Sequence, residues 1–219
     1  MPRKNAYEDG CAAAHAMDLI GERWALLIAR ELMTGPLRFS DLKTALPGIS
    51  TSMLTTRLND LEVYGVITRR TTPPPTPAQI YELTEWGRGL EQVLITLGQW
   101  AVQSPHLPQG KPMSAASILL SLKAMFAPSL AKGFSARLNL SCNGQAHSVW
   151  VGNSRLQLSH GHHNRPDASI TGDPNLLAAI VYDGMALSEA ETAGLLIEGD
   201  RSVVDRFKGL FPLPNLSTA

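Results

Sequence analysis

Four small polar side chains recur at helical spacing between residues 50 and 60. They are Ser52, Thr55, Thr56 and Asn59. Leu54, Leu58 and Leu61 fall at i, i+4 and i+7 and predict the buried face of the same helix. Short hydroxyl and amide side chains approach base edges and phosphates closely without filling a major groove. The pattern therefore fits hydrogen bonding to nucleic acid, and the alternative of an ordinary solvated helix face stays open at this point.

An expected hairpin follows this helix and carries two arginines. Its strands are predicted at Val66–Arg70 and Gln79–Leu83, and the residues from Pro73 to Pro77 form a proline-rich tip. Arg69 and Arg70 lie near that tip, where they can contact backbone phosphate or enter a minor groove.

The elements that must position these side chains begin with two short helices around a turn at Pro47 and Gly48. Ser40 is expected to cap the first helix and Ser50 the second. Upstream, a longer helix is expected to bury one face, and Gly35 with Pro36 ends it. That face comprises Trp24, Leu27, Ile28 and Leu32.

The overall charge does not favour nucleic-acid binding, because the chain has 19 basic and 19 acidic residues. Between Leu37 and Arg70 the basic residues outnumber the acidic ones by five to three. The basic ones are Arg38, Lys43, Arg57, Arg69 and Arg70, and the acidic ones are Asp41, Asp60 and Glu62. Arg57 lies on the flank of the polar helix, so reaching a phosphate and pairing with Asp60 or Glu62 both remain open.

The two cysteines differ in their expected surroundings. Cys11 precedes the first expected helix, and a helix N-terminus lowers a thiol pKa. The alternative for Cys11 is a small residue packed at an interface between subunits. Cys142 belongs to an alternating apolar face and predicts an inert buried thiol. Their spacing predicts neither a disulfide scaffold nor a zinc site, which fits a reducing compartment.

No catalytic or metal-binding arrangement emerges from spacing. His160, His162 and His163 lie close together but lack a distant carboxylate or cysteine partner, so they predict a polar turn. The sequence shows no Ser/His/Asp order, phosphate loop or paired carboxylates. We therefore expect no enzyme activity, no cofactor and no metal.

The second half of the chain changes from helical period to alternation. A helix is expected over Ser114–Lys132, and Phe134 to Cys142 then alternate apolar and polar residues as a strand does. Further expected elements are strands at His147–Val151, Arg155–Ser159, Ala168–Thr171 and Leu195–Glu198, a helix capped by Asp173 that ends near Gly184, and a helix through Val203 and Leu210.

These elements predict an α+β protein with two domains. The boundaries are residues 1–105, a proline-rich linker at 106–113, and residues 114–219. The chain is 44% hydrophobic and 17% charged, as folded proteins are. We see neither a secretory signal nor a membrane span, so a cytoplasmic protein is expected.

The first half resembles the HxlR family of bacterial winged helix-turn-helix regulators. The matching residues run from Cys11 through "MDLIGERWALLIARELMTGPLRFSDLKTALPGIS" and "LTTRLNDLEVYGVITRR" to "YELTEWGRGL". The resemblance implies a symmetric homodimer in which the first helix and the long helix after Thr84 pack between subunits, while two recognition helices enter successive major grooves of an inverted-repeat operator. The implied contacts with double-stranded DNA are Ser40, Lys43, Ser50, Thr51, Ser52, Thr55, Thr56, Arg57, Asn59, Arg69 and Arg70.

Two further expectations attach to this resemblance. In some family members a cysteine at the place of Cys11 is a thiol sensor of oxidants or electrophiles. Trp24, Trp86 and Trp100 are expected to be core or dimer anchors rather than stacking platforms for bases.

The second half resembles sterol-carrier-protein-like domains through "RPDASITGDPNLLAAIVYDG" and "GLLIEGDRSVVDRFKGLF". The resemblance implies a sheet covered by helices around a tunnel for apolar molecules, although the same residues can also form a filled core. The expected pocket residues are Leu122, Met125, Phe126, Leu138, Leu140, Ile180, Phe207 and Phe211.

Together these patterns predict a dimeric, DNA-binding transcriptional regulator controlled by an apolar small molecule, with no membrane partner. The alternative is a lipid- or small-molecule-binding protein that uses its winged helix mainly for dimerisation or protein interaction.

Overall fold

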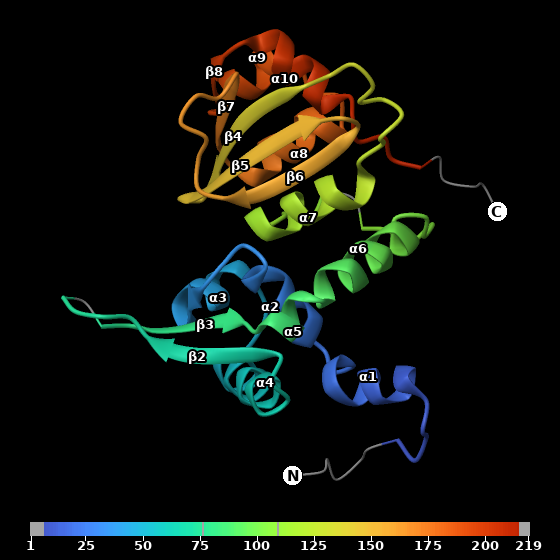
Figure 1. The fold of residues 1–219 in the computed structure, drawn as a ribbon, viewed down its shortest axis with the longest axis vertical. Coiled ribbons are helices and arrows are strands. Elements are labelled where there is room, and N and C mark those ends of the chain that lie inside the picture. The colour runs from blue at the N-terminus through green and yellow to red at the C-terminus, as the bar shows by residue number, and fades with distance from the viewer. Residues whose placement is uncertain (1–6, 76, 109, 215–219) are drawn as a thin grey trace. The chain divides into compact units, whose positions relative to one another are not determined.

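The computed structural model describes residues 7–75, 77–108 and 110–214. The chain divides into two compact units, Met1–Leu94 and Ile95–Ala219 (Figure 1). The division falls inside helix α6 (Leu90–Ala101). The assignment of residues 106–113 as a linker between domains stays a prediction.

The first unit combines helices with a small sheet. Its helices are α1 (Ala12–Ile20), α2 (Ala25–Leu32), α3 (Phe39–Ala45), α4 (Thr51–Val63), α5 (Glu85–Arg88) and the start of α6. Strands β1 (Leu37–Arg38), β2 (Ile67–Thr71) and β3 (Gln79–Leu83) form an antiparallel sheet in the order β1-β3-β2. This arrangement is a helix-turn-helix, α3 and α4, followed by a β-hairpin wing.

Helix α4 begins as the sequence predicts, whereas α3 does not. The Ser50 hydroxyl accepts the Met53 amide at 3.1 Å and caps α4. Helix α3 begins at Phe39, one residue before Ser40, and the Arg38 amide donates to the Asp41 carboxylate at 3.1 Å. The prediction that Ser40 caps α3 is therefore wrong, because Ser40 is the second residue of the helix and Arg38 holds the N-cap position.

The core of the first unit confirms the predicted buried face of α4. Leu54, Leu58 and Leu61 are at most 1% exposed. On α2 the buried face is Ala25, Ile28, Ala29 and Leu32, which follows i, i+3, i+4 and i+7. Leu27 lies off this stripe and is 37% exposed, so its assignment to the core was wrong.

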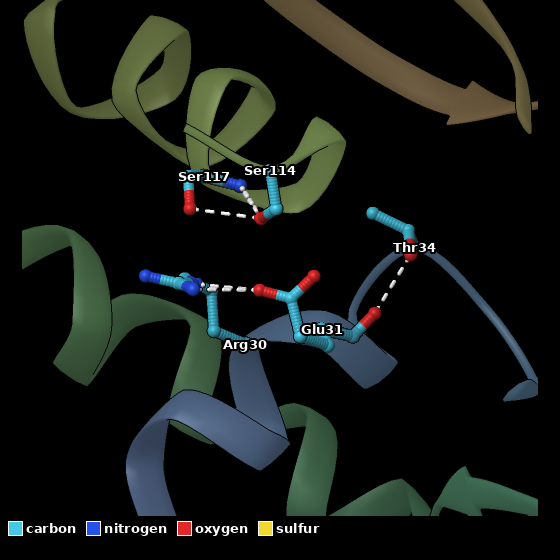
Figure 2. A network of polar contacts seen from close by, with 5 residues as sticks. All are labelled: Arg30, Glu31, Thr34, Ser114 and Ser117. Carbon is cyan, nitrogen blue, oxygen red and sulfur yellow. Dashed lines mark hydrogen bonds and ion pairs between the residues drawn. The ribbon is translucent and has the colours of Figure 1, made fainter. Parts of the chain in front are cut away.

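Glu31 is a buried carboxylate on α2, and its neighbours satisfy it. Arg30 donates from Nε and Nη2 to Glu31 Oε1 at 2.9 and 2.7 Å (Figure 2). Thr34 lies just after α2, which ends at Leu32, and its hydroxyl donates to the backbone carbonyl of Glu31 at 2.7 Å. Gly35 follows with φ of 117°, the left-handed conformation that turns the chain away from the helix.

The base of the wing is fastened to α5. The Thr84 hydroxyl accepts the Gly87 amide at 2.9 Å and donates to the Gly65 carbonyl at 2.7 Å. A Cβ atom at Gly87 would overlap the Val66 carbonyl oxygen, so only glycine permits this approach. The wing therefore has a fixed origin relative to α4, which ends at Val63.

The second unit is a five-stranded sheet with helices. Its elements are α7 (Ala115–Met125), β4 (Ala136–Cys142), β5 (Gln145–Gly152), β6 (Arg155–His160), β7 (Ala168–Gly172), α8 (Pro174–Tyr182), α9 (Leu187–Thr192), β8 (Leu196–Gly199) and α10 (Arg201–Lys208). The strand order is β6-β5-β4-β7-β8, in which only β4 and β7 pair in parallel.

One face of this sheet packs against the helices (Figure 1). The alternation that begins at Ala136 places Leu138 and Leu140 in the core, where both are 0% exposed. They join Val204 and Phe207 of α10 in one apolar cluster. This confirms the predicted strand.

Two expectations about helices in this unit were wrong or incomplete. Ser114 caps α7, because its hydroxyl accepts the Ser117 amide at 3.0 Å (Figure 2). Helix α7 ends at Met125, whereas the sequence predicted that it would continue to Lys132. Pro128 disfavours helical backbone in the residue before it, and Phe126 already has an extended ψ of 125°. Helix α9 was not predicted because its six residues are too few to show a period.

None of the helices in the described segments is long and apolar enough to cross a membrane.

Candidate nucleic-acid interface

The outer face of α4 is exposed as predicted. Ser52, Thr55, Thr56 and Asn59 all lie at the surface. The Thr55 and Thr56 hydroxyls donate to the Thr51 and Ser52 carbonyls, each at 2.9 Å. Each hydroxyl oxygen therefore keeps lone pairs for an incoming donor, and each threonine also has a methyl group. Such side chains can accept from the amino groups of cytosine or adenine and pack against a thymine methyl.

The N-terminus of α4 adds further polar groups to this face. Ser50 and Thr51 are exposed, and the hydroxyls of Ser50 and Ser52 lie 3.1 Å apart. A helix N-terminus favours phosphate because its first amides are unpaired and its dipole is positive there. On α3, Ser40 is exposed and Lys43 is half-buried.

Arg57 forms ion pairs within the protein. Its guanidinium lies 2.6 Å from Asp60 and 3.0 Å from Glu22, and its side chain is only 13% exposed. Of the two options that the sequence left open, the structure shows pairing with Asp60. Arg57 thus ties α4 to the turn before α2, and a contact with phosphate would require it to leave two carboxylates.

The wing arginines are paired more loosely. Arg69 lies 3.0 Å from Glu62 at the end of α4, and Arg70 lies 2.8 Å from Glu82 across the hairpin. The two arginine side chains are 40% and 48% exposed. Exposed pairs of this kind contribute only about 0–1 kcal/mol, so a phosphate can replace either carboxylate. Sequence reasoning missed both partners because neither lies within four residues of its arginine.

Several large apolar side chains near α6 are exposed. Trp86 and Trp100 are 59% and 75% exposed, so their assignment to the core is wrong and the dimer alternative remains. Val93 and Leu97 lie on α6 at i and i+4 with Trp100 at i+7, and they are 43% and 41% exposed. These three residues form the α6 stripe. Trp24 is half-buried and packs on the core of the first unit.

Cys11 is the exposed N-cap residue of α1, and Cys142 is buried in β4. The backbone amides of Ala13 and Ala14 at the start of α1 lower the pKa of the Cys11 thiol. Burial, with a smaller contribution from the Asp173 charge, raises the pKa of Cys142 to about 11. The predicted contrast between the two environments is therefore present, whereas a sensor role for Cys11 stays a prediction.

We expect iodoacetamide to alkylate Cys11 at least about tenfold faster than Cys142, because only the thiolate reacts. At pH 8 a thiol with a pKa of about 11 is ionised in only about one molecule in a thousand. Timed peptide mass spectrometry measures both rates, and Cys11→Ser identifies the signal of the remaining thiol. Faster labelling of Cys142 would contradict the assignment.

The predicted pocket residues of the second unit lie together in its apolar cluster. Leu122, Leu138, Leu140, Ile180, Phe207 and Phe211 are buried, and Met125 and Phe126 pack against them. The rings of Phe207 and Phe211 meet edge to face with centroids 4.9 Å apart. Whether this cluster opens for a ligand stays a prediction.

The histidine-rich turn disperses its side chains. The His160 ring contacts the ring of His147 with centroids 5.3 Å apart. His162 Nε2 lies 2.9 Å from the Ser141 hydroxyl, and His163 Nε2 lies 3.1 Å from the Val149 carbonyl oxygen. Each histidine of the turn thus has its own partner.

The geometry of the first unit defines a winged helix-turn-helix protein, and comparisons with known proteins agree. Residues 19–107 match the HxlR-like helix-turn-helix family. The HTH-type transcriptional regulator YodB of Bacillus subtilis is 40% identical over 88 residues, which are 40% of this chain and 79% of that protein. YvaP of the same organism, described as an uncharacterized HTH-type transcriptional regulator, is 39% identical over 89 residues, or 40% of this chain and 82% of that protein.

The chain therefore belongs to the HxlR-like helix-turn-helix family. Another relative, sll1512 of Synechocystis, is an uncharacterized HTH-type transcriptional regulator that is 42% identical over 87 residues, 40% of this chain. The match spans 64% of the length of that protein. The solved structure of the reduced form of YodB has 35% sequence identity and a TM-score of 0.41, covering 46% of this chain and 100% of that chain.

Proposed function

We propose that this protein is a sequence-specific regulator of transcription that binds double-stranded DNA. The observation that carries the proposal is the exposed hydroxyl and amide face of α4, held on a fully buried leucine core within a helix-turn-helix. In this proposal α4 enters the major groove and the wing contacts the flanking backbone. Relatives named as HTH-type transcriptional regulators support it.

The proposal assigns direct or backbone contacts to eleven side chains. They are Ser40, Lys43, Ser50, Thr51, Ser52, Thr55, Thr56, Arg57, Asn59, Arg69 and Arg70. Those on α4 face base edges, whereas the wing arginines bind phosphate or a minor groove. Arg57 supports α4 through its two carboxylate partners and reaches phosphate only by leaving both of them.

A homodimer completes the proposed site. The α6 stripe and Met17 of α1, which is 46% exposed, offer apolar surface to a second copy. Two copies related by a twofold axis would read an inverted repeat with half-site centres about one duplex turn, or a multiple, apart. Such a regulator acts on chromosomal DNA in the cytoplasm.

We propose that residues 114–219 form a sterol-carrier-like domain in which an apolar molecule modulates DNA binding. The five-stranded sheet with its helical cover and apolar cluster supports this assignment. An effector changes DNA affinity only if it binds one state of the dimer more tightly, typically by about 1–3 kcal/mol. Fatty acids, sterols and aromatic compounds that raise the unfolding temperature of the full chain should then shift its DNA affinity.

The wing is tested by the double variant Arg69→Gln/Arg70→Gln. We expect weaker binding to all duplex sequences alike and a salt slope flatter by roughly 0.9 for each phosphate that the variant no longer neutralises. Anisotropy titrations of duplex DNA across a salt series measure both quantities. Arg201→Gln is the matched control, because Arg201 is also an exposed, ion-paired arginine. An unchanged salt slope in the double variant would remove the wing from the interface.

A further inference from the structure

A hollow of about 420 Å³ lies on the second unit, lined by Arg137, His163, Asn164 and Arg165. It forms where the first residues of β4 meet the segment between β6 and β7, residues 161–167. Arg137 alternates with Ala136 and Leu138, whose side chains are buried in the core. The hollow therefore lies on the face of the sheet opposite the helices. Its volume falls within the roughly 300–1,000 Å³ typical of sites for small molecules.

Two cationic side chains of this hollow have no carboxylate partner among the residues that the structure describes. Within residues 7–75, 77–108 and 110–214, neither Arg137 nor Arg165 forms an ion pair, whereas Arg57, Arg69 and Arg70 all do. Asp167 is a near neighbour, but its carboxylate accepts the backbone amide of Arg137 at 2.7 Å. A guanidinium presents a planar fork of donors that matches carboxylate and phosphate oxygens.

The wall of the hollow is held in place by a buried amide. Asn139 on β4 is only 7% exposed although the alternation of the strand points it away from the core. Its Oδ1 accepts the His163 amide at 2.8 Å, and its Nδ2 donates to the His163 carbonyl at 3.2 Å. The His163 ring is held against the Val149 carbonyl oxygen at 3.1 Å. These bonds fix residue 163 at the edge of the hollow.

The far end of the same segment is anchored as firmly. The Asp167 amide donates to the Arg137 carbonyl at 2.7 Å, and the Asp200 amide donates to the Asp167 carbonyl at 2.8 Å. A Cβ atom at Gly199 would come within 2.5 Å of the Asp167 carbonyl oxygen. Asn164 and Arg165 thus lie between two fixed points, so a ligand would meet a wall that is already ordered.

We propose that this hollow binds a small molecule bearing a carboxylate or phosphate group, with Arg137 and Arg165 as the residues that recognise the oxyanion. The site is separate from the apolar cluster proposed above, because the sheet lies between them. The ligand proposed for the hollow is negatively charged, whereas the ligand proposed for the apolar cluster is apolar. The proposal does not depend on DNA binding, since the ligand would be held by residues of the second unit alone.

Isothermal titration calorimetry on the full chain tests the site with inorganic phosphate, phenyl phosphate and benzoate, and with benzamide and benzyl alcohol as neutral analogues. We expect at least one oxyanion to bind and the neutral analogues not to bind. Arg137→Gln and Arg165→Gln should each weaken binding about tenfold, the usual effect of losing one charge-assisted hydrogen bond. Arg155→Gln is the matched control, because Arg155 is exposed on the same sheet and does not line the hollow.

The probes also distinguish the two kinds of oxyanion. Binding of benzoate alone indicates a carboxylate ligand. Binding of inorganic phosphate or phenyl phosphate indicates a phosphate ligand. Because both arginines are exposed, the variants should keep the unfolding temperature of the parent chain. An oxyanion that binds should raise that temperature more in the parent and in Arg155→Gln than in the Arg137 and Arg165 variants. The proposal fails if no oxyanion binds, if a neutral analogue binds as tightly as the oxyanions, or if the double variant Arg137→Gln/Arg165→Gln keeps full affinity. It also fails if the double variant loses affinity for duplex DNA but not for the small oxyanions.

Discussion

Replacing Thr55 by Glu is expected to lower the affinity for duplex DNA at least about 100-fold, because a carboxylate at that place would face the negative charge of the groove and cost several kcal/mol. Thr55 is exposed, and its hydroxyl bonds only its own helix, to the Thr51 carbonyl at 2.9 Å. The fold should therefore tolerate the change. Fluorescence anisotropy of a labelled duplex measures the loss, and circular dichroism verifies the helix content.

The chain offers a closely matched control for this variant. Thr192 on α9 is an exposed helical threonine whose hydroxyl donates to the Ser188 carbonyl at 2.9 Å. Thr192→Glu adds the same charge to the second unit and should leave DNA affinity within about twofold of the parent. Equal losses in both variants would mean that net charge, and not the face of α4, governs binding.

Replacing Leu58 by Ala is expected to destabilise the first unit by about 2–5 kcal/mol, the usual range for a buried leucine. Leu58 is 1% exposed and lies midway along the buried face of α4, between Leu54 and Leu61. Hydrogen exchange detected by mass spectrometry gives the opening free energy of α2 and α4 peptides separately from the second unit. DNA binding should weaken together with this stability.

Met53→Ala is the control for that variant, because Met53 lies on the same helix and is 37% exposed. We expect it to change the opening free energy of α4 by well under about 1 kcal/mol. If Leu58→Ala lowered the opening free energy of α4 no more than Met53→Ala does, packing of the leucine face would not be what holds α4 in place.

Periodicity predicted most of the elements that carry the candidate interface. The leucines of α4 repeat every three to four residues, and a helix buried on one face must expose the other, so the polar face followed directly. The hairpin was predicted from two β-rich runs around a proline-rich tip. The alternation from Ala136 to Cys142 likewise predicted β4.

The errors arose where contacts distant in sequence decide the outcome. The alternation of β4 alone would place Asn139 in solvent, but the residues that follow β6 cross that face of the sheet and bury its amide. The partners of Arg69 and Arg70 come from another element or another strand, and no local rule identifies them. Leu27 was misplaced because apolar residues surround the true stripe of α2 on both sides.

Footprinting of the purified full chain on genomic DNA fragments tests most directly whether α4 reads a DNA sequence. We predict protected inverted repeats whose half-site centres lie about 10–10.5 base pairs, or a multiple, apart. The protection should disappear with Thr55→Glu and persist with Thr192→Glu. Uniform protection without a shared sequence, or protected repeats that remain unchanged with Thr55→Glu, would mean that α4 does not read a DNA sequence.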